Sequence, residues 1–257
     1  MMTGKKFRRL FFDIETSPNV VFSWNVGYDV RIDHDNILKE RAIICICYKF
    51  EGDKKVHHLT WNKGDDKKML EKFAGIINTA DEVIGHNSDK FDIKWVRTRC
   101  LYHGIPMTHD IKSIDTLKAS RSKFRFNSNK LDYIGKYLGL GEKLDTGGFS
   151  LWKDIILKNS RQAMNKMVEY CKQDVILLES IFQKINSYIP VKTNAAVMFE
   201  RDSIACPECL SEHTVVNRHK VSAAGIKSIS MHCQSCGKYF SISQTKFDQA
   251  SIKPADE

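Results

Sequence analysis

Two acidic residues near the start of the chain are spaced as a divalent-metal site requires. Asp13 and Glu15 end the apolar run RRLFFDIETSP. Residues two apart in a strand point to the same side of the sheet, so both carboxylates would lie together at the rim of an apolar core. There they repel one another and resist losing water. Divalent cations bound between them remove that penalty, so the pair predicts a metal site.

Further polar residues complete the candidate site. In GHNSDKFDIKWV, Asp92 stands just inside a predicted helix, five residues after Asn87. In YCKQDVILL, Tyr170 and Asp174 are four residues apart on a long predicted helix, which puts phenol and carboxylate on one face. Each motif is common alone, and their combination in this order carries the hypothesis.

Four cysteines near the C-terminus form a second candidate site. Two Cys-x-x-Cys pairs are separated by 23 residues, and Gly237 follows the last cysteine where the chain must turn sharply. Four thiolates at this spacing can close a tetrahedron around zinc, although His213 and His232 could substitute as ligands. The short alternating runs between and after the pairs resemble a zinc ribbon, in which the metal is structural. The expected ligands are Cys206, Cys209, Cys233 and Cys236.

A basic stretch suggests contact with nucleic acid. The segment TLKASRSKFRFNSNKL has five cations, two phenylalanines and no acid. Cations meet phosphates, and aromatic rings stack on unpaired bases. A solvated basic loop is the alternative. The candidate contacts are Arg121, Lys123, Phe124 and Arg125, with Phe126 as the other ring.

The elements that must position these residues alternate along the chain. Apolar runs predict strands, and apolar residues at helical spacing predict helices. We expect a mixed α/β sheet with helices packed on it. The predicted strands are 7–13, 20–26, 41–50, 81–87 and 109–116; the predicted helices are KKMLEKFAGIINTA, KFDIKWVRTRCLYHG and a long one over about 160–187.

Composition limits the classes of protein. The 257 residues carry a net charge of +9, which favours a polyanionic partner. No apolar run could span a bilayer and no secretion signal is visible, so a cytoplasmic location without membrane partners is expected. We predict a domain over 1–188, a linker over 189–203, the ribbon over 204–245 and a polar tail over 246–257. Cys45, Cys47, Cys100 and Cys171 are interpreted as small core residues.

One segment before the long helix allows two interpretations. KLDTGGFSLWKD contains Gly147 and Gly148 ahead of Phe149 and Trp152. It could form a flexible lip over the candidate site, or a turn followed by a helix packed on the core. The sequence does not choose between them.

The acidic motifs in this order resemble the three exonuclease motifs of the DEDD superfamily. Tyr170, where another branch has His, is similar to the branch of the 3′→5′ proofreading domains of family-B DNA polymerases and their stand-alone relatives. The resemblance covers about residues 7–187 and implies an RNase H-like fold. The chain is too short for a polymerase, so a free-standing exonuclease is expected.

The resemblance also implies roles for particular residues. Asp13, Glu15, Asp92 and Asp174 would hold two Mg²⁺ or Mn²⁺ ions, and Tyr170 would orient the attacking water. Such an enzyme releases nucleoside 5′-monophosphates from the 3′ ends of single-stranded DNA. The residues expected to bracket the terminal nucleotide are Thr16, Ser17, Asn87 and Phe91, with core packing as the alternative for Phe91.

Other functions remain open at this level. The same chemistry could act on RNA, since no residue identifiably reads a 2′-hydroxyl. A catalytically silent protein could keep the fold and bind nucleic acid through the ribbon, but it would have no need for four acids and a tyrosine. An RNase H-fold endonuclease is disfavoured by the Tyr-x-x-x-Asp helix. The ribbon itself could contact nucleic acid, dock a protein or only add stability.

Overall fold

The computed structural model describes residues 7–141, 148–202 and 204–251. These divide into two compact units, which we describe separately. The larger comprises Arg8–Arg121 and Phe126–Ile181; the smaller comprises mainly Phe182–Glu257, with Ser122–Arg125. Of the segment 143–154, predicted as either a lip or a turn followed by a helix, residues 143–147 lie outside the described part of the chain.

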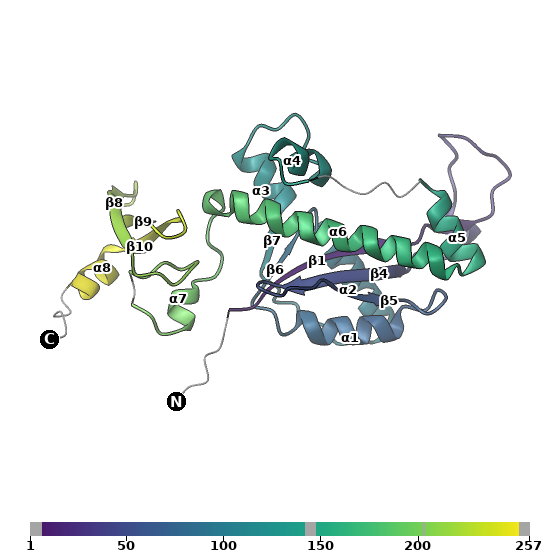
Figure 1. Cartoon of the computed structure of the whole chain (residues 1–257), viewed down its shortest axis with the longest axis horizontal. Coiled ribbons are helices and arrows are strands. Elements are labelled where there is room, and N and C mark those ends of the chain that lie inside the picture. The colour runs from purple at the N-terminus through teal and green to yellow at the C-terminus, as the bar shows by residue number, and fades with distance from the viewer. Residues whose placement is uncertain (1–6, 142–147, 203, 252–257) are drawn as a thin grey trace. The chain divides into compact units, whose positions relative to one another are not determined.

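A mixed five-stranded sheet forms the centre of the larger unit, counted over the described residues (Figure 1). β1 lies in the middle, antiparallel to β4 and parallel to β6, so strands of both senses meet at its edges. The predicted α/β class is therefore confirmed. In sheet order the strands are β5 (His57–Thr60), β4 (Ile43–Phe50), β1 (Arg9–Thr16), β6 (Glu82–Gly85) and β7 (Ser113–Asp115).

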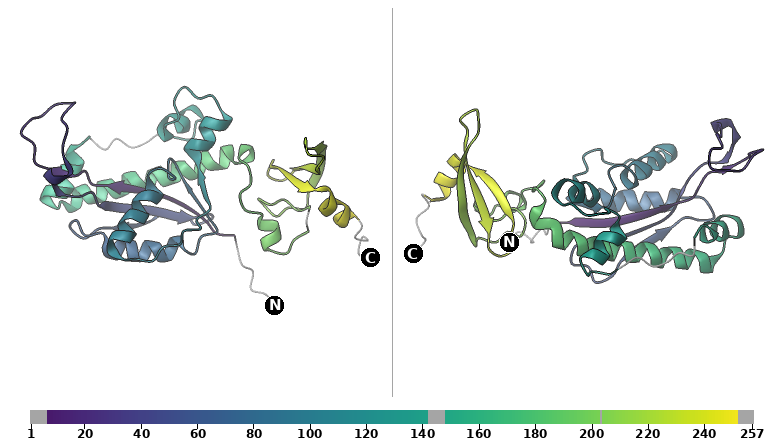
Figure 2. Two further views of the ribbon diagram at one scale, coloured as in Figure 1. Left: turned by 180° about the vertical axis from the view of Figure 1, so that it is seen from behind. Right: turned by 90° about the horizontal axis from the view of Figure 1, so that it is seen from above.

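Helices cover both faces of this sheet. On one face Phe12 and Tyr48 contact Phe73 of α1 (Lys67–Ile77), with ring centroids 5.5 and 6.0 Å apart. α2 (Asp92–His103) packs on α1 and β4 on that side. On the other face α6 (Arg161–Ile185) runs along the sheet, as Figures 1 and 2 show. Here the thiol of Cys47 contacts the carbonyl oxygen of Val168 at 3.6 Å.

The remaining helices of the larger unit lie near the sheet ends. α5 begins directly after the turn at Gly148, and the indole N–H of its Trp152 donates to the carbonyl oxygen of Thr16 at 3.1 Å. For the described residues, a turn followed by a packed helix is thus the observed arrangement. The bounds are α3 (Thr116–Lys123), α4 (Leu131–Tyr137) and α5 (Ser150–Lys158).

The strand predicted over 20–26 is wrong beyond its first two residues. Only β2 (Val20–Val21) forms, and it pairs with β3 (Ile37–Lys39) outside the main sheet, next to a single 3₁₀ turn (His34–Asn36). Phe22, Trp24 and Val26 are exposed, so the apolar alternation has no sheet face to cover. Burial against other elements, which the local pattern does not contain, decides whether such a run becomes a strand.

A buried carboxylate joins three elements of the larger unit. Asp66, at the start of α1, is fully buried and accepts hydrogen bonds from Arg99 Nε and Nη2, both at 2.8 Å. It also accepts from the Ile43 N–H and contacts His103 Nε2 at 2.7 Å. Burial acts to raise the pKa of Asp66, but the hydrogen bonds from Arg99, Ile43 and His103 hold it below its ordinary value.

Removing this charge should destabilise the larger unit. We expect Asp66→Asn to lower the free energy of unfolding by about 3–5 kcal/mol, because it leaves the buried Arg99 guanidinium uncompensated. Asp110→Asn is the control: its side chain is exposed and lies outside this cluster. Urea unfolding monitored by circular dichroism measures both variants, and equal stabilities would contradict the prediction.

The stabilisation that the Asp66 carboxylate provides is lost at low pH. The folded pKa of Asp66 lies below the unfolded value of about 3.9, so the stabilisation is present above that pH. It is lost as the pH falls through the folded pKa.

The smaller unit contains a three-stranded antiparallel sheet among its described residues, in the order β10-β9-β8. Its strands are β8 (Thr214–Val221), β9 (Lys227–Cys233) and β10 (Tyr239–Ser243), as the alternating runs predicted. The predicted polar tail is partly helical, since α8 spans Gln244–Ser251. The predicted linker contains the short helix α7 (Ala195–Met198), after a 3₁₀ turn (Asn186–Tyr188).

None of the helices in the described ranges has both the length and the apolar character of a transmembrane span.

Candidate active site

Three of the predicted acids meet where β1 ends against α6. Carboxylate oxygens of Asp13, Glu15 and Asp174 all lie within 4.8 Å of one another. Asp174 is 2% exposed, whereas Asp13 and Glu15 are half-buried. Three carboxylates this close to an apolar core repel each other strongly unless a cation lies between them. Their oxygen donors suit Mg²⁺, Mn²⁺ or Ca²⁺ better than softer metals.

The register of the sheet explains this convergence. Asp13 lies opposite Cys47 and Glu15 opposite Cys45, so acids and thiols share the face that α6 covers. Small buried cysteines at these positions leave room for the helix to approach, which agrees with their interpretation as core residues. The acids therefore come within reach of Asp174.

Cys171 makes a direct contact with the acid cluster. Its Sγ is 3.5 Å from both the carbonyl oxygen and Oδ2 of Asp13. Burial raises the pKa of this thiol well above its ordinary value, so it is neutral and can donate a weak hydrogen bond. A thiol that the sequence suggested only fills space thus also orients a carboxylate.

Asp92 lies beside β1 rather than inside the cluster of three. It is 3% exposed at the start of α2, and its Oδ1 accepts the backbone N–H of Ile14 at 3.2 Å. Ile14 is the residue between the two acids of β1. Asp92 therefore binds the backbone that carries Asp13 and Glu15, and its role as a metal ligand stays a prediction.

The other residues predicted around the acids occupy different environments. Tyr170 is half-buried on α6, one turn before Asp174. Phe91 is half-buried and lies edge-on to Trp95, with ring centroids 6.4 Å apart. Ser17 is 3% exposed, and its Oγ accepts the Ala42 N–H at 3.0 Å. This hydroxyl therefore links the end of β1 to the start of β4.

A loop after β6 is shaped by an acid that the sequence analysis did not select. Asp115, at the end of β7, is 4% exposed and its Oδ1 accepts the N–H of Asn87 and of Leu117, both at 2.9 Å. Asn87 has a left-handed backbone with φ of 67°, which Asn tolerates better than most residues. A carboxylate at the carboxyl end of a strand parallel to β1 was the available signal.

A cavity of about 650 Å³ lies beside this loop. Asn87 and Arg121, two of the predicted nucleic-acid contacts, line it together with His86 and Lys130. Amide, imidazole and cationic groups around one cavity suit a polar, anionic ligand.

The basic stretch is helical in its first half, since α3 ends at Lys123. Arg121, Lys123 and Arg125 are exposed. Phe124 is half-buried against Tyr188, with ring centroids 5.2 Å apart and the rings edge-on. The three cations are therefore placed to meet solvent, and Phe124 already has a packing partner.

Metal binding to the acids should be measurable without any substrate. At a Mn²⁺ concentration of about 100 Kd, we expect a stabilisation of about 2.7 kcal/mol. For a protein of this size that raises the Tm by roughly 5–10 °C. Asp174→Asn should abolish the shift, because the cluster loses a charged ligand.

A second acidic group supplies the control for this experiment. Asp33, His34 and Asp35 also lie within 4.8 Å of one another, but all three are exposed. Asp35→Asn should keep the Mn²⁺ shift in differential scanning fluorimetry. A shift that survives Asp174→Asn and disappears in Asp35→Asn would assign the binding to the exposed group instead.

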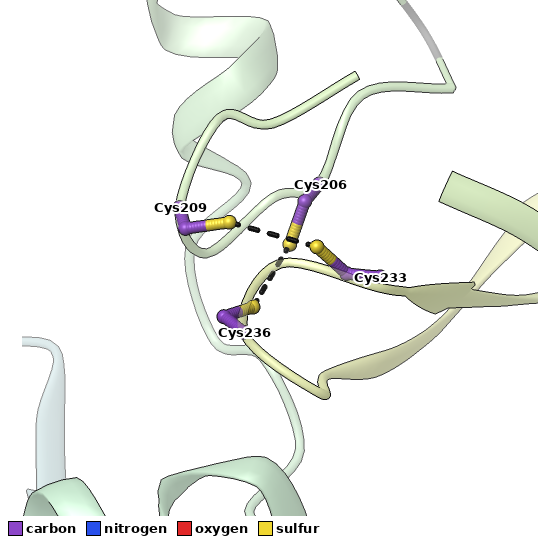
Figure 3. A group of neighbouring side chains, drawn as sticks. All are labelled: Cys206, Cys209, Cys233 and Cys236. Carbon is purple, nitrogen blue, oxygen red and sulfur yellow. Dashed lines mark hydrogen bonds between the residues drawn. The ribbon is translucent and has the colours of Figure 1, made fainter. Parts of the chain in front are cut away.

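The four cysteines of the smaller unit converge as predicted (Figure 3). Sγ of Cys206 and Cys236, and Sγ of Cys209 and Cys233, are each 3.6 Å apart. Thiolates about 2.3 Å from a central ion would form a tetrahedron with edges of about 3.8 Å. The observed distances match such a site and are too long for disulfides, which measure about 2.05 Å.

Each cysteine pair stands on a tight turn of the same design. Leu210 and Gly237, directly after Cys209 and Cys236, both have left-handed backbones with φ of 64° and 72°. The N–H of Gly237 donates to the Cys233 carbonyl at 2.9 Å. Burial acts to raise the pKa of Cys233, but hydrogen bonds from the N–H groups of Cys236 and Ser235 and from neighbouring thiols lower it to about 7. Burial raises the pKa of Cys206 to about 11.

Loss of one of these thiols should remove the metal of this site. We expect the native chain to hold about one equivalent of metal here and Cys236→Ser to hold almost none, because a structural site needs all four ligands. Plasma mass spectrometry after gel filtration measures the ion. Cys100→Ala, which removes a buried thiol outside the cluster, should keep the metal; a loss there as well would point to general unfolding.

Comparisons with known proteins agree with this geometry. A family described as the RNase_H superfamily matches residues 10–186. The catalytic subunit of DNA polymerase epsilon from Dictyostelium discoideum is 26% identical over 129 residues, which are 45% of this chain and 5% of that protein. The chain thus spans a small fraction of the length of this curated relative.

Proposed function

The chain belongs to the RNase H superfamily, and on this basis we propose that it is a metal-dependent 3′→5′ exonuclease acting on single-stranded DNA. The observation that carries the proposal is the convergence of Asp13, Glu15 and Asp174 within 4.8 Å. Proteins of this fold that cleave nucleic acids use divalent metals, and such an acidic cluster is the arrangement that holds them. The similarity to a DNA polymerase supports DNA as the substrate.

The acids would act first as ligands. Asp13, Glu15 and Asp174 would hold two Mg²⁺ or Mn²⁺ ions, with Asp92 as a further ligand by its resemblance to the exonuclease motifs. When bound, the ions supply an acidified water and neutralise the charge that develops on the leaving 3′ oxygen. The bond to the terminal nucleotide would be hydrolysed, releasing a nucleoside 5′-monophosphate.

Other side chains of this chain would position the reactants. Tyr170, one helical turn before Asp174, would orient the attacking water by a hydrogen bond, since a phenol with a pKa of about 10 is a poor base at neutral pH. Cys171 would hold the Asp13 carboxylate in place through its contact at 3.5 Å. By the resemblance to the exonuclease motifs, Thr16, Ser17, Asn87 and Phe91 would bracket the terminal nucleotide.

We propose zinc as the ion of the four-cysteine site. The support is the donor set itself: four thiolates with tetrahedral spacing are typical of structural zinc. Such a small sheet, with few large apolar side chains, depends on its metal to fold.

Digestion of a 5′-labelled single-stranded DNA oligonucleotide tests the activity. With Mg²⁺ or Mn²⁺ we expect a ladder that shortens from the 3′ end and disappears in EDTA. Asp13→Ala should abolish it, and Tyr170→Phe should slow it about 10²-fold, because the attacking water loses the hydrogen bond that orients it and a misplacement of about 1 Å can cost that much. Both variants should keep the native circular-dichroism spectrum.

Two further substrates separate the alternatives. A circular single strand should remain intact, because an exonuclease has no end from which to start; cleavage of the circle would indicate an endonuclease. An RNA of the same sequence should be digested more slowly than the DNA, and faster digestion of the RNA would overturn the proposed substrate.

A further inference from the structure

In the sheet formed by β8, β9 and β10, the strands β9 and β10 bury side chains on one face, and the opposite face is called the open face; the residues of β8 are largely exposed on both faces. Ile229, Met231 and Ile242 lie in a buried cluster with Cys206 and Cys233. Phe247 of α8, the linker residue Val191 and Ile204 pack against that cluster. Because side chains alternate along a strand, the residues between these buried positions lie on the opposite face.

The strand pairing arranges the open face in three rows. Nearest the cysteines, Tyr239 and Val215 both pair with His232. In the next two rows a serine from β10 and one from β9 are followed by a cation from β8. These rows are Ser241, Ser230 and Arg218, then Ser243, Ser228 and Lys220. Within them Ser230 is buried, and its Oγ accepts a hydrogen bond from the side-chain amide of Asn217 at 3.5 Å.

Each row offers a different interaction. The rings of Tyr239 and His232 stack with centroids 4.3 Å apart and an interplanar angle of 18°, and Tyr239 is 53% exposed. This makes a rigid aromatic platform on which an unpaired base can stack. Arg218 and Lys220 add positive charge, and the sequences of the three strands contain no Asp or Glu.

A cavity adjoins the aromatic end of this face. It has a volume of about 410 Å³, and its lining includes Tyr239, Ser241 and Lys192. Pro190 and Pro207 also line it. Its size lies in the range of small-ligand sites, and its lining combines an aromatic ring with a cation, as a nucleotide requires.

We propose that the open face of this sheet is a second binding site for single-stranded DNA, separate from the acidic cluster. Bases stack on Tyr239 and enter the cavity beside it, while phosphates are bound by Arg218 and Lys220. The charge pattern selects a polyanion, and the stacked rings select unpaired bases over a duplex or an acidic peptide. The proposal concerns binding alone, so it does not require hydrolysis at the acids.

The test measures the affinity of the full chain for fluorescent oligonucleotides by anisotropy. Buffer free of Mg²⁺ and Mn²⁺ prevents digestion. Arg218→Glu combined with Lys220→Glu should weaken binding of a 30-nucleotide single strand at least tenfold. The slope of log affinity against log salt should fall by about 1.4, since each phosphate contact on a single strand contributes about 0.7.

Matched variants guard against general charge and folding effects. Arg201→Glu combined with Lys184→Glu changes the net charge equally, through exposed cations of the same unit that lie outside the open face. It should change the affinity less than twofold. All variants must keep the metal content and circular-dichroism spectrum of the native chain.

Tyr239→Ala tests the stacking platform separately. It should weaken binding of the single strand about tenfold and leave the affinity for a blunt duplex unchanged, because paired bases cannot stack on the ring. Equal affinity of the Arg218/Lys220 variant and its matched control would overturn the proposal, as would equal losses on single strand and duplex in Tyr239→Ala.

The outcome is independent of the proposed exonuclease. If the native chain digests no DNA but the Arg218/Lys220 variant binds it more weakly as expected, the exonuclease proposal alone is overturned. If digestion occurs but the Arg218/Lys220 variant binds like its matched control, the second binding site alone is overturned.

Discussion

Repulsion among Asp13, Glu15 and Asp174 is the constraint around which the larger unit is built. Their oxygens lie within 4.8 Å of one another, and Asp174 is almost fully removed from water. Carboxylates in such a place raise the free energy of the folded chain unless cations neutralise them. The rest of the unit must hold them together before any ion arrives, and a central strand and a long helix, both anchored in an apolar core, supply that rigidity.

The sheet topology brings the residues that support the acids to the same edge of the sheet, where the parallel strands have their carboxyl ends. β1, β6 and β7 are parallel, so the acids of β1, the loop with Asn87 and the carboxylate of Asp115 all follow carboxyl ends of neighbouring strands. That edge is where ligands bind in open sheets with helices on both faces. Asp115 then fixes the loop through backbone N–H groups, and Asp92 fixes β1 in the same way through Ile14. Buried acids thus position other groups as well as forming the candidate metal site.

The sequence predicted those parts whose pattern is strong and local. The long helix expected over 160–187 spans Arg161–Ile185, and the Cys-x-x-Cys spacing predicted a cluster that the structure contains. The prediction of a strand over 20–26 was wrong because Phe22 and Trp24 alternate with polar residues as in a strand, but no other element packs against their side chains. The roles of Asp115 and Cys171 depend on contacts between residues far apart in the chain, so no local pattern could reveal them.

The two faces of β1 have a further consequence for how the molecule tolerates substitution. Phe12 and Ile14 point to the side of α1 and α2, whereas Asp13 and Glu15 point to the side of α6. At these four positions, neighbouring residues therefore lie in different parts of the molecule: Phe12 and Ile14 pack in the core, and Asp13 and Glu15 form part of the candidate metal site. Substitutions at Phe12 and Ile14 should accordingly lower thermal stability, whereas substitutions at Asp13 and Glu15 should impair metal binding with little loss of stability.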